Sequence, residues 1–128
     1  MKHLVRILSF SLALFGSIGV AQAATALSHS RKYFDESGAL VGEQYLLCSN
    51  HSGHGGNIHT AYFIDEQTGC PGALIDPDTW IIPGKIVTAY TLPGSLSITT
   101  ACSVASCQND SSPEVNVLTL WTYDVGWQ

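Results

Sequence analysis

Short apolar runs separated by turn residues dominate the chain from Tyr33 onward. The runs are rich in Val, Ile, Thr and Tyr, which favour β-strands, and Gly, Pro, Asn or Asp end them. After the first 23 residues, no stretch of 10 or more residues shows the apolar spacing of an amphipathic helix. The pattern therefore predicts an all-β fold, a small antiparallel sheet or sandwich made of hairpins.

Individual elements follow from the same pattern. Tyr33-Phe34 and the run that starts at Leu40 form a hairpin whose turn lies near Ser37-Gly38. Pro93-Gly94 suits the central positions of a type II turn between two further arms. Residues 49–57 hold no large apolar side chain and are predicted to be a loop. The strands expected are 40–48, 58–64, 79–82, 85–92, 95–101 and 115–123, with a turn over 65–69 and a tight loop over 102–107.

The first 23 residues have the pattern of a secretory signal peptide. Lys2 and Arg6 precede an apolar run over 7–20, which closes on the small-x-small triplet Ala21-Gln22-Ala23. Serines and glycines interrupt the run, which is shorter than the ~18 residues of a membrane-spanning helix. We expect residues 1–23 to be removed on export, the alternative being an uncleaved anchor. No cysteine stands at the cleavage point, so a lipid anchor is not indicated.

The mature chain has room for one small domain. Removal of the leader leaves about 105 residues, a length typical of a single domain with a modest core. Residues 24–32 are small and polar without a period, and we expect a flexible start there. The domain itself is expected over 33–128.

Charge excludes two classes of partner. The full chain carries a net charge of −5, and the loss of Lys2 and Arg6 with the leader would bring it to about −7. Arg31, Lys32 and Lys85 are the basic residues that remain. Such a chain repels phosphate backbones and anionic lipid surfaces, so neither nucleic acid nor stable membrane insertion after leader removal is expected.

The four cysteines predict a disulfide framework, because even numbers of cysteines in short exported chains are normally oxidised. Four cysteines allow three pairings, and the residues alone do not choose among them. Nearness in sequence favours Cys48–Cys70 and Cys102–Cys107. By chain entropy these bridges would contribute about 3 and about 2 kcal/mol.

One cluster has the residue types of a metal site. His51, His54 and His59 lie close together in sequence, and neutral imidazoles are ligands for Zn²⁺ or Cu²⁺. The histidines fall on a loop and a strand, however, and an exposed polar loop is the preferred interpretation. No cofactor is expected, with Zn or Cu as the alternative.

Catalytic patterns are absent from the sequence. It holds no Gly-x-Ser-x-Gly elbow, His-Glu-x-x-His motif, P-loop or dinucleotide-binding glycine pattern. Cys102 and Cys107 lack the Cys-x-x-Cys spacing of a redox pair. Trp80, Trp121, Trp127 and the tyrosines could form a binding face, although core and edge packing is the commoner role of such residues.

A set of residues between Tyr33 and Pro71 forms a further pattern: Tyr33-Phe34-Asp35, Val41-Gly42-Glu43, Cys48, a glycine near Gly55 or Gly56, Thr60-x-Tyr62 and Cys70-Pro71. This pattern resembles the small exported bacterial proteins of an uncharacterised domain-of-unknown-function family. The resemblance implies secretion, a short β module and a Cys48–Cys70 bridge, and it implies no activity. Members typically end near the second cysteine, so the β-rich extension 72–128 lies outside the resemblance.

We therefore expect a secreted or periplasmic, non-catalytic small β protein that serves as a binding or envelope module for an unknown protein or small ligand. The first alternative is a periplasmic metal-binding protein that uses His51, His54 and His59. A further alternative is a protein inhibitor of a hydrolase, which would present loop 49–57 to a basic enzyme.

Overall fold

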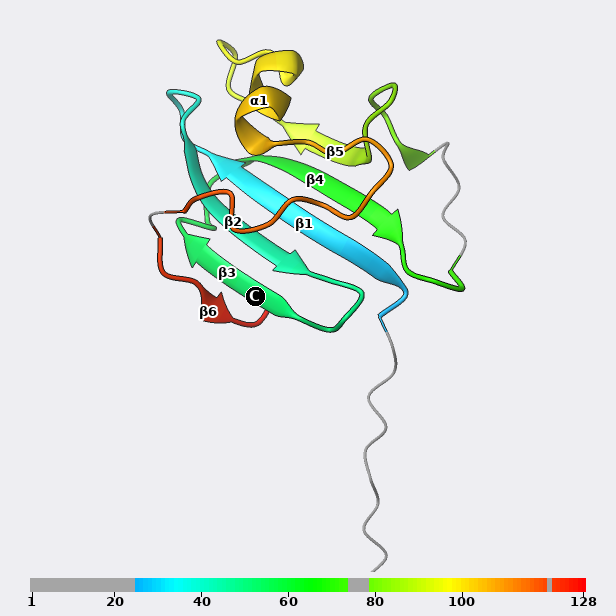
Figure 1. Cartoon of the computed structure of the whole chain (residues 1–128). Helices are drawn as coiled ribbons and strands as arrows, with labels where there is room; N and C mark the ends of the chain where they lie inside the picture. The colour runs from blue at the N-terminus through cyan, green and yellow to red at the C-terminus, as the bar shows by residue number, and fades with distance from the viewer. Residues whose placement is uncertain (1–24, 74–78, 120) are drawn as a thin grey trace, which may run out of the picture.

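The computed structural model describes residues 25–73, 79–119 and 121–128, so the predicted leader lies outside the described residues. Within these residues six strands form one antiparallel sheet, in the order β5-β4-β1-β2-β3-β6, and a short helix packs on it (Figure 1). This confirms the prediction of a small all-β fold. The elements are β1 (Leu27–Phe34), β2 (Leu40–Leu46), β3 (Ser52–Gly56), β4 (Tyr62–Gly69), β5 (Val87–Thr91), α1 (Ile98–Ala105) and β6 (Asp124–Val125).

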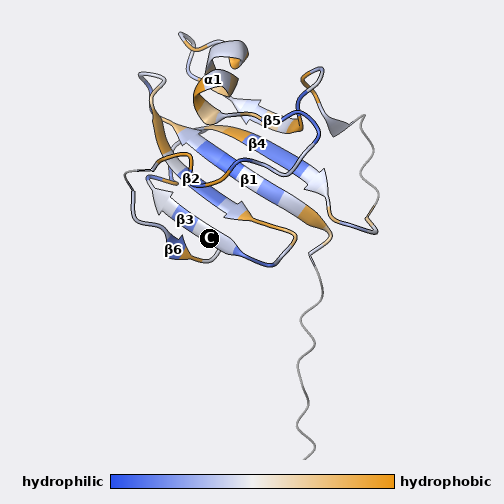
Figure 2. Ribbon diagram, viewed as in Figure 1, coloured by the Kyte–Doolittle hydropathy of each residue, from blue (hydrophilic) through white to orange (hydrophobic). Residues whose placement is uncertain are grey.

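The central strand is β1, which corrects the expected flexible start at 24–32. β1 pairs with β2 on one edge, where His29 lies opposite Leu46, and with β4 on the other, where Leu27 lies opposite Gly69. The strand was missed because its buried positions are polar: Ser28, Ser30 and Lys32 are all fully buried. Hydrophilic colours in the middle of β1 and β4 mark the same feature (Figure 2).

The β1–β2 hairpin forms where the turn residues predict it. Asp35 accepts hydrogen bonds from the backbone N–H groups of Ser37 and Ala39 at 2.9 and 3.0 Å. The Ser37 hydroxyl donates to the same carboxylate at 2.6 Å, and together with the backbone bonds it holds the pKa of the Asp35 carboxyl below its usual value. Gly38 adopts a φ of +84°, which glycine tolerates without steric conflict. The turn is therefore built from local chemistry alone.

Helix α1 replaces the second arm of the hairpin predicted around Pro93-Gly94. Strand β5 forms as expected, but residues 98–105 are helical. Ser97 caps the helix, since its side chain accepts a hydrogen bond from Thr100 N at 3.1 Å. The buried face of α1 places Ala101 and Ala105 in the core cluster with Phe34, Ile64 and Val87. Burial of this small-residue face outweighs the β-propensity of the Ile-Thr-Thr segment at its start.

Strands β3 and β4 also depart from the predictions. β3 occupies most of the predicted loop 49–57, and β4 runs through the predicted turn 65–69 instead of starting at residue 58. Close packing explains the glycines of β3: a Cβ on Gly53 would lie 2.8 Å from the Tyr45 hydroxyl oxygen, and one on Gly55 would lie 3.0 Å from the Thr122 carbonyl oxygen. The atoms that cover this strand thus come from other parts of the chain.

The end of the chain forms little regular structure. Neither 79–82 nor the described part of 115–123 is a strand, and β6 has only two residues. The segment between α1 and β6 instead crosses one face of the sheet (Figure 1). We call its described residues, 108–119 and 121–123, the C-terminal strap. The strap is held by hydrogen bonds to side chains of the sheet in place of strand pairing.

Both disulfides join cysteines that are nearest in sequence. Cys48, just after β2, is bonded to Cys70 at the end of β4, and Cys102 in α1 is bonded to Cys107 just beyond it. No free cysteine remains in the described part of the chain. Of the three possible pairings, the structure selects the one that nearness favours.

Candidate functional site

The sheet has two chemically different faces. Strand alternation places Ser28, Ser30, Lys32 and Phe34 of β1 on one face, which α1 and the C-terminal strap cover. We call it the covered face. The opposite face, which we call the open face, carries His29, Arg31 and Tyr33 of β1. Phe63 and Asp65 of β4 lie on it as well, because the register places Asp65 opposite Arg31 and Phe63 opposite Tyr33.

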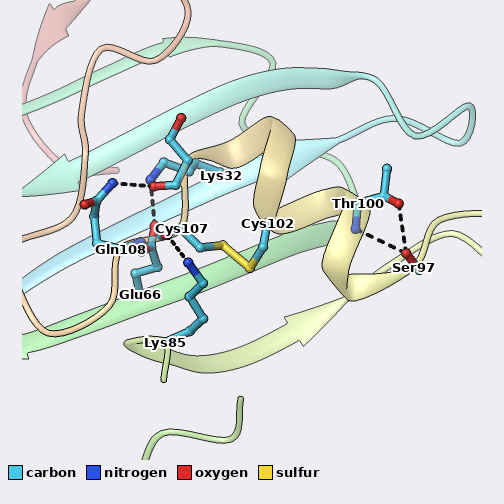
Figure 3. The surroundings of a disulfide bond; sticks show 9 residues. Lys32, Glu66, Lys85, Ser97, Thr100, Cys102, Cys107 and Gln108 are labelled. Carbon is cyan, nitrogen blue, oxygen red and sulfur yellow. Dashed lines mark hydrogen bonds and ion pairs between the residues drawn. A yellow bond between two sulfur atoms is a disulfide. The ribbon is translucent and has the colours of Figure 1, made fainter. Parts of the chain in front are cut away.

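A buried ion pair lies at the centre of the covered face. Lys32 Nζ donates to Glu66 Oε1 at 2.6 Å, and both side chains are completely buried. The second carboxylate oxygen of Glu66 accepts a hydrogen bond from the backbone N–H of Gln108, at the start of the strap, at 2.8 Å. Figure 3 shows these groups next to the Cys102–Cys107 disulfide. Glu66 therefore links the sheet to the strap.

Glu43 of β2 holds the other end of the strap. Its Oε2 accepts from the Tyr123 hydroxyl at 2.6 Å and from Val117 N at 3.0 Å. Burial raises the pKa of the Glu43 carboxyl, although these hydrogen bonds and the nearby Lys32 charge oppose the change. Burial and the hydrogen bond to Glu43 raise the pKa of Tyr123 as well. Both groups are engaged in attaching the strap to the sheet.

Among the described residues, no hydrogen-bond partner is found for three buried polar atoms of the covered face: Ser28 Oγ, Ser30 Oγ and Glu43 Oε1. They belong to β1 and β2, next to the Lys32–Glu66 pair. Buried polar atoms normally have a hydrogen-bond partner in the protein or in water. These three exceptions show that the covered face holds more polar atoms than it pairs internally.

A second ion pair lies on the open face, one residue away from the first. Arg31 donates from Nε and Nη2 to the two oxygens of Asp65, both at 2.6 Å. The guanidinium also lies 4.3 Å from the centre of the Phe63 ring, within range of a cation–π interaction. Burial works to raise the pKa of Asp65, but the hydrogen bonds from Arg31 and His29 outweigh it, so the pKa lies below its usual value.

The last residues of the chain lie against the open face. The rings of His29 and Trp127 are 4.4 Å apart, and His29 Nε2 lies 3.4 Å from Asp65 Oδ1. Gln44 Oε1 accepts a hydrogen bond from Gln128 N at 3.1 Å. Contacts therefore connect five side chains, because Asp65 joins the His29–Trp127 ring pair to the Arg31–Phe63 pair. We refer to these five residues as the open-face strip.

The structure does not bring the three predicted metal ligands together. His54 Nδ1 donates to Gly126 O at 2.7 Å, whereas His51 is exposed and its ring lies near Tyr45. His59 is exposed in the loop before β4. Among the described residues, no group of three or more His, Cys, Asp or Glu side chains is placed to hold a metal ion. We therefore derive no metal chemistry from this loop.

Sequence reasoning missed most of the open-face strip. Arg31 and His29 fell in the segment expected to be flexible, and Asp65 fell in a predicted turn. The available signal was alternation over 28–33, where Ser28, Ser30 and Lys32 alternate with His29, Arg31 and Tyr33. Trp127 is one of the three tryptophans for which the sequence suggests a binding face as the alternative to packing.

Comparisons with protein-family models, with curated proteins and with solved structures found no match to this chain. The resemblance of residues 33–71 to an exported family therefore stays a prediction. In the part of the chain that the structure describes, no helix has the length and apolar character that crossing a membrane requires.

Proposed function

We propose that the chain is exported and acts as a non-catalytic binding protein, with the open-face strip as its recognition surface. The observation that carries this proposal is the rigid presentation of Arg31, held by Asp65 and stacked on Phe63 while its side chain keeps 33% of its surface exposed. Arginine and aromatic residues are enriched at protein interfaces and at their energetic centres. A guanidinium fixed in advance loses less conformational entropy when a partner binds.

The distribution of charge supports a basic protein as the partner. Arg31 and Lys32 are neutralised by carboxylates, and Lys85 donates to a backbone carbonyl. In contrast, Glu36, Asp110, Glu114 and Asp124 are exposed, and no ion pair involves them within the described residues. Asp124 lies opposite His54 in the sheet, at the edge of the open face. The described surface therefore carries an excess of unpaired acidic charge, and Asp124 brings one such charge to the edge of the open face.

The use of the buried titratable groups supports a non-catalytic role. Glu43 and Glu66 accept hydrogen bonds from the strap, and Lys32 and Tyr123 each donate to one of them. In the arrangement observed, each of these groups is engaged in holding the strap against the sheet or in pairing a buried charge.

Two disulfides in a small domain fit an oxidising compartment, which supports export. Mass spectrometry of the native protein tests this part directly. We expect a mass that lacks residues 1–23 and four hydrogens. An intact chain with free thiols, recovered from the cytoplasm, would contradict export.

Site-specific photo-crosslinking tests the recognition surface. A benzoylphenylalanine replaces Phe63 in the strip or, as the control, Tyr90 of β5, an aromatic residue that is 39% exposed outside the strip. In the native extracellular or periplasmic fraction we expect a basic protein to be crosslinked at position 63 only. The adduct should be competed by unlabelled protein, weaken with salt and disappear in the Trp127→Ala background. Equal labelling from both positions, or none from position 63, would refute the assignment.

The structure favours this proposal over the two alternatives. The metal-binding alternative requires three histidines that do not converge. The inhibitor alternative requires a projecting loop over 49–57, and most of that segment is strand β3, paired on both edges.

A further inference from the structure

A cavity of about 310 Å³ lies beside α1, on a different part of the molecule from the open-face strip. Ile82 and Pro83 line it on one side, and Ile98 and Cys102 of α1 line it on another. Lys85, Thr99 and Ser103 complete the lining. Cys102 is in a disulfide, so its sulfur contributes apolar surface and no free thiol. The volume lies at the lower end of the range for small-molecule sites, about 300 to 1,000 Å³.

Lys85 distinguishes this cavity from ordinary surface relief. It is the one basic side chain of the described residues without a carboxylate partner, because Arg31 and Lys32 are paired with Asp65 and Glu66. Within the described residues its Nζ donates one hydrogen bond, to Cys107 O at 2.9 Å (Figure 3). An ammonium group has three N–H donors, so two are left for a ligand. The bond to Cys107 holds the charge beside the disulfide.

We infer that this cavity binds a small monocarboxylate with an apolar body, such as a medium-chain fatty acid. The carboxylate pairs with Lys85 Nζ, with the Thr99 and Ser103 hydroxyls as further polar groups of the lining. The hydrocarbon packs on Ile82, Pro83 and Ile98. A single ammonium in a chain of net charge −5 selects a ligand with one negative charge over polyanions such as nucleotides.

The inference goes beyond the proposed function and does not depend on it, since no residue of the open-face strip lines the cavity. It assigns a second kind of ligand to a second place. A failure of one proposal therefore leaves the other standing.

Titration of the full exported chain with octanoate, followed by two-dimensional amide NMR, tests the inference. We expect saturable shifts centred on Ile82, Lys85 and Ser103, and none at Arg31 or Phe63. 1-Octanol has the same chain without the charge and should bind at least tenfold more weakly. Lys85→Met should also weaken octanoate binding at least tenfold, and Lys85→Arg should retain most of it.

A cavity-filling pair of variants keeps the test independent of Lys85. Ser103 and Val104 are both exposed on α1, but only Ser103 lines the cavity. Ser103→Trp should abolish octanoate binding, whereas Val104→Trp should leave it unchanged. Shifts that do not saturate, that persist in Ser103→Trp, or that octanol reproduces at the same concentration would overturn the inference.

Discussion

Two ion pairs of the same kind, formed by neighbouring residues, lie on opposite faces of the sheet. Arg31 pairs with Asp65, and Lys32 pairs with Glu66, each with a nitrogen–oxygen distance of 2.6 Å. The Arg31 side chain keeps 33% of its surface exposed and lies beside an aromatic ring, whereas Lys32 and Glu66 keep none. Equal contact distances therefore have unequal consequences, because solvent screens one pair and is excluded from the other.

Strand β1 therefore contributes to both faces of the sheet in different ways. On the covered face the charges are removed from water and bind the strap, so each depends on its partner to offset a large desolvation penalty. On the open face the carboxylate orients a guanidinium that water and a ligand can still reach. The covered face holds the strap to the sheet, and the open face carries the surface that we propose for recognition.

The largest expected effect comes from removing one cation from each face in turn. Lys32→Met leaves Glu66 ionised and unpaired in the interior, and we expect it to lower the free energy of unfolding by about 3 to 5 kcal/mol. Arg31→Met leaves a buried Asp65 that still has His29 Nε2 at 3.4 Å, and we expect it to lower the free energy of unfolding by less, about 1 to 3 kcal/mol. Urea unfolding at neutral pH measures both values.

The double variant Lys32→Met with Glu66→Gln serves as the control for this pair. Neutralising both partners should recover part of the stability lost in Lys32→Met, because no buried charge is then left alone. Equal losses in the two single variants would show that burial does not distinguish the faces.

A smaller effect is expected where the strap contacts β3. Gly56 has a φ of +69°, and a Cβ there would lie 1.3 Å from the Trp121 ring, so Trp121 must move in Gly56→Ala. We expect a loss of about 1 to 3 kcal/mol in the same unfolding assay. Gly84→Ala is the matched control, since Gly84 has a φ of +70° and a Cβ there meets no atom within 4 Å. A loss at Gly84 as large as that at Gly56 would argue against tight packing of the strap.

The smallest effect concerns how stability depends on pH. Neutralising a carboxylate on the open face and one on the covered face should change this dependence in opposite directions, by on the order of 1 kcal/mol for each variant. The pKa of Asp65 is lowered in the fold, so its contribution to stability is present above its ordinary pKa of 3.8 and is lost as the pH falls through the lower folded value. Asp65→Asn should therefore be less stable than the wild type at neutral pH, and the gap should narrow in acid.

Glu43 should behave in the opposite way. Its pKa is raised in the fold, so the penalty for ionising it is absent below its ordinary pKa of 4.5 and appears as the pH rises through the raised value. The stability of Glu43→Gln relative to the wild type should therefore improve with rising pH. Unfolding curves at a series of pH values test both variants. If the stabilities of the two variants relative to the wild type changed with pH in the same direction, the contrast between the faces would be wrong.

Local chemistry made part of the fold predictable. The β1–β2 turn follows from Asp35, which accepts backbone hydrogen bonds, and from Gly38, which takes the left-handed conformation. The β-branched and aromatic runs indicated an all-β protein, and short chain separations favoured the disulfides that the structure contains. Each of these signals acts between residues close in sequence, so it can be recognised without knowing the fold.

The sites, in contrast, depend on residues far apart in the chain. A polar β1 can lie in the middle of the sheet because Glu66 pairs with Lys32. A glycine-rich β3 is covered because Trp121 and Tyr123, from the C-terminal part of the chain, pack against it. The open-face strip joins residues separated by 34 positions in the Arg31–Asp65 pair alone. The residue pattern alone therefore predicts the class of the fold and the β1–β2 turn. Tertiary structure decided which polar residues are buried and which are presented, because burial depends on what covers a residue.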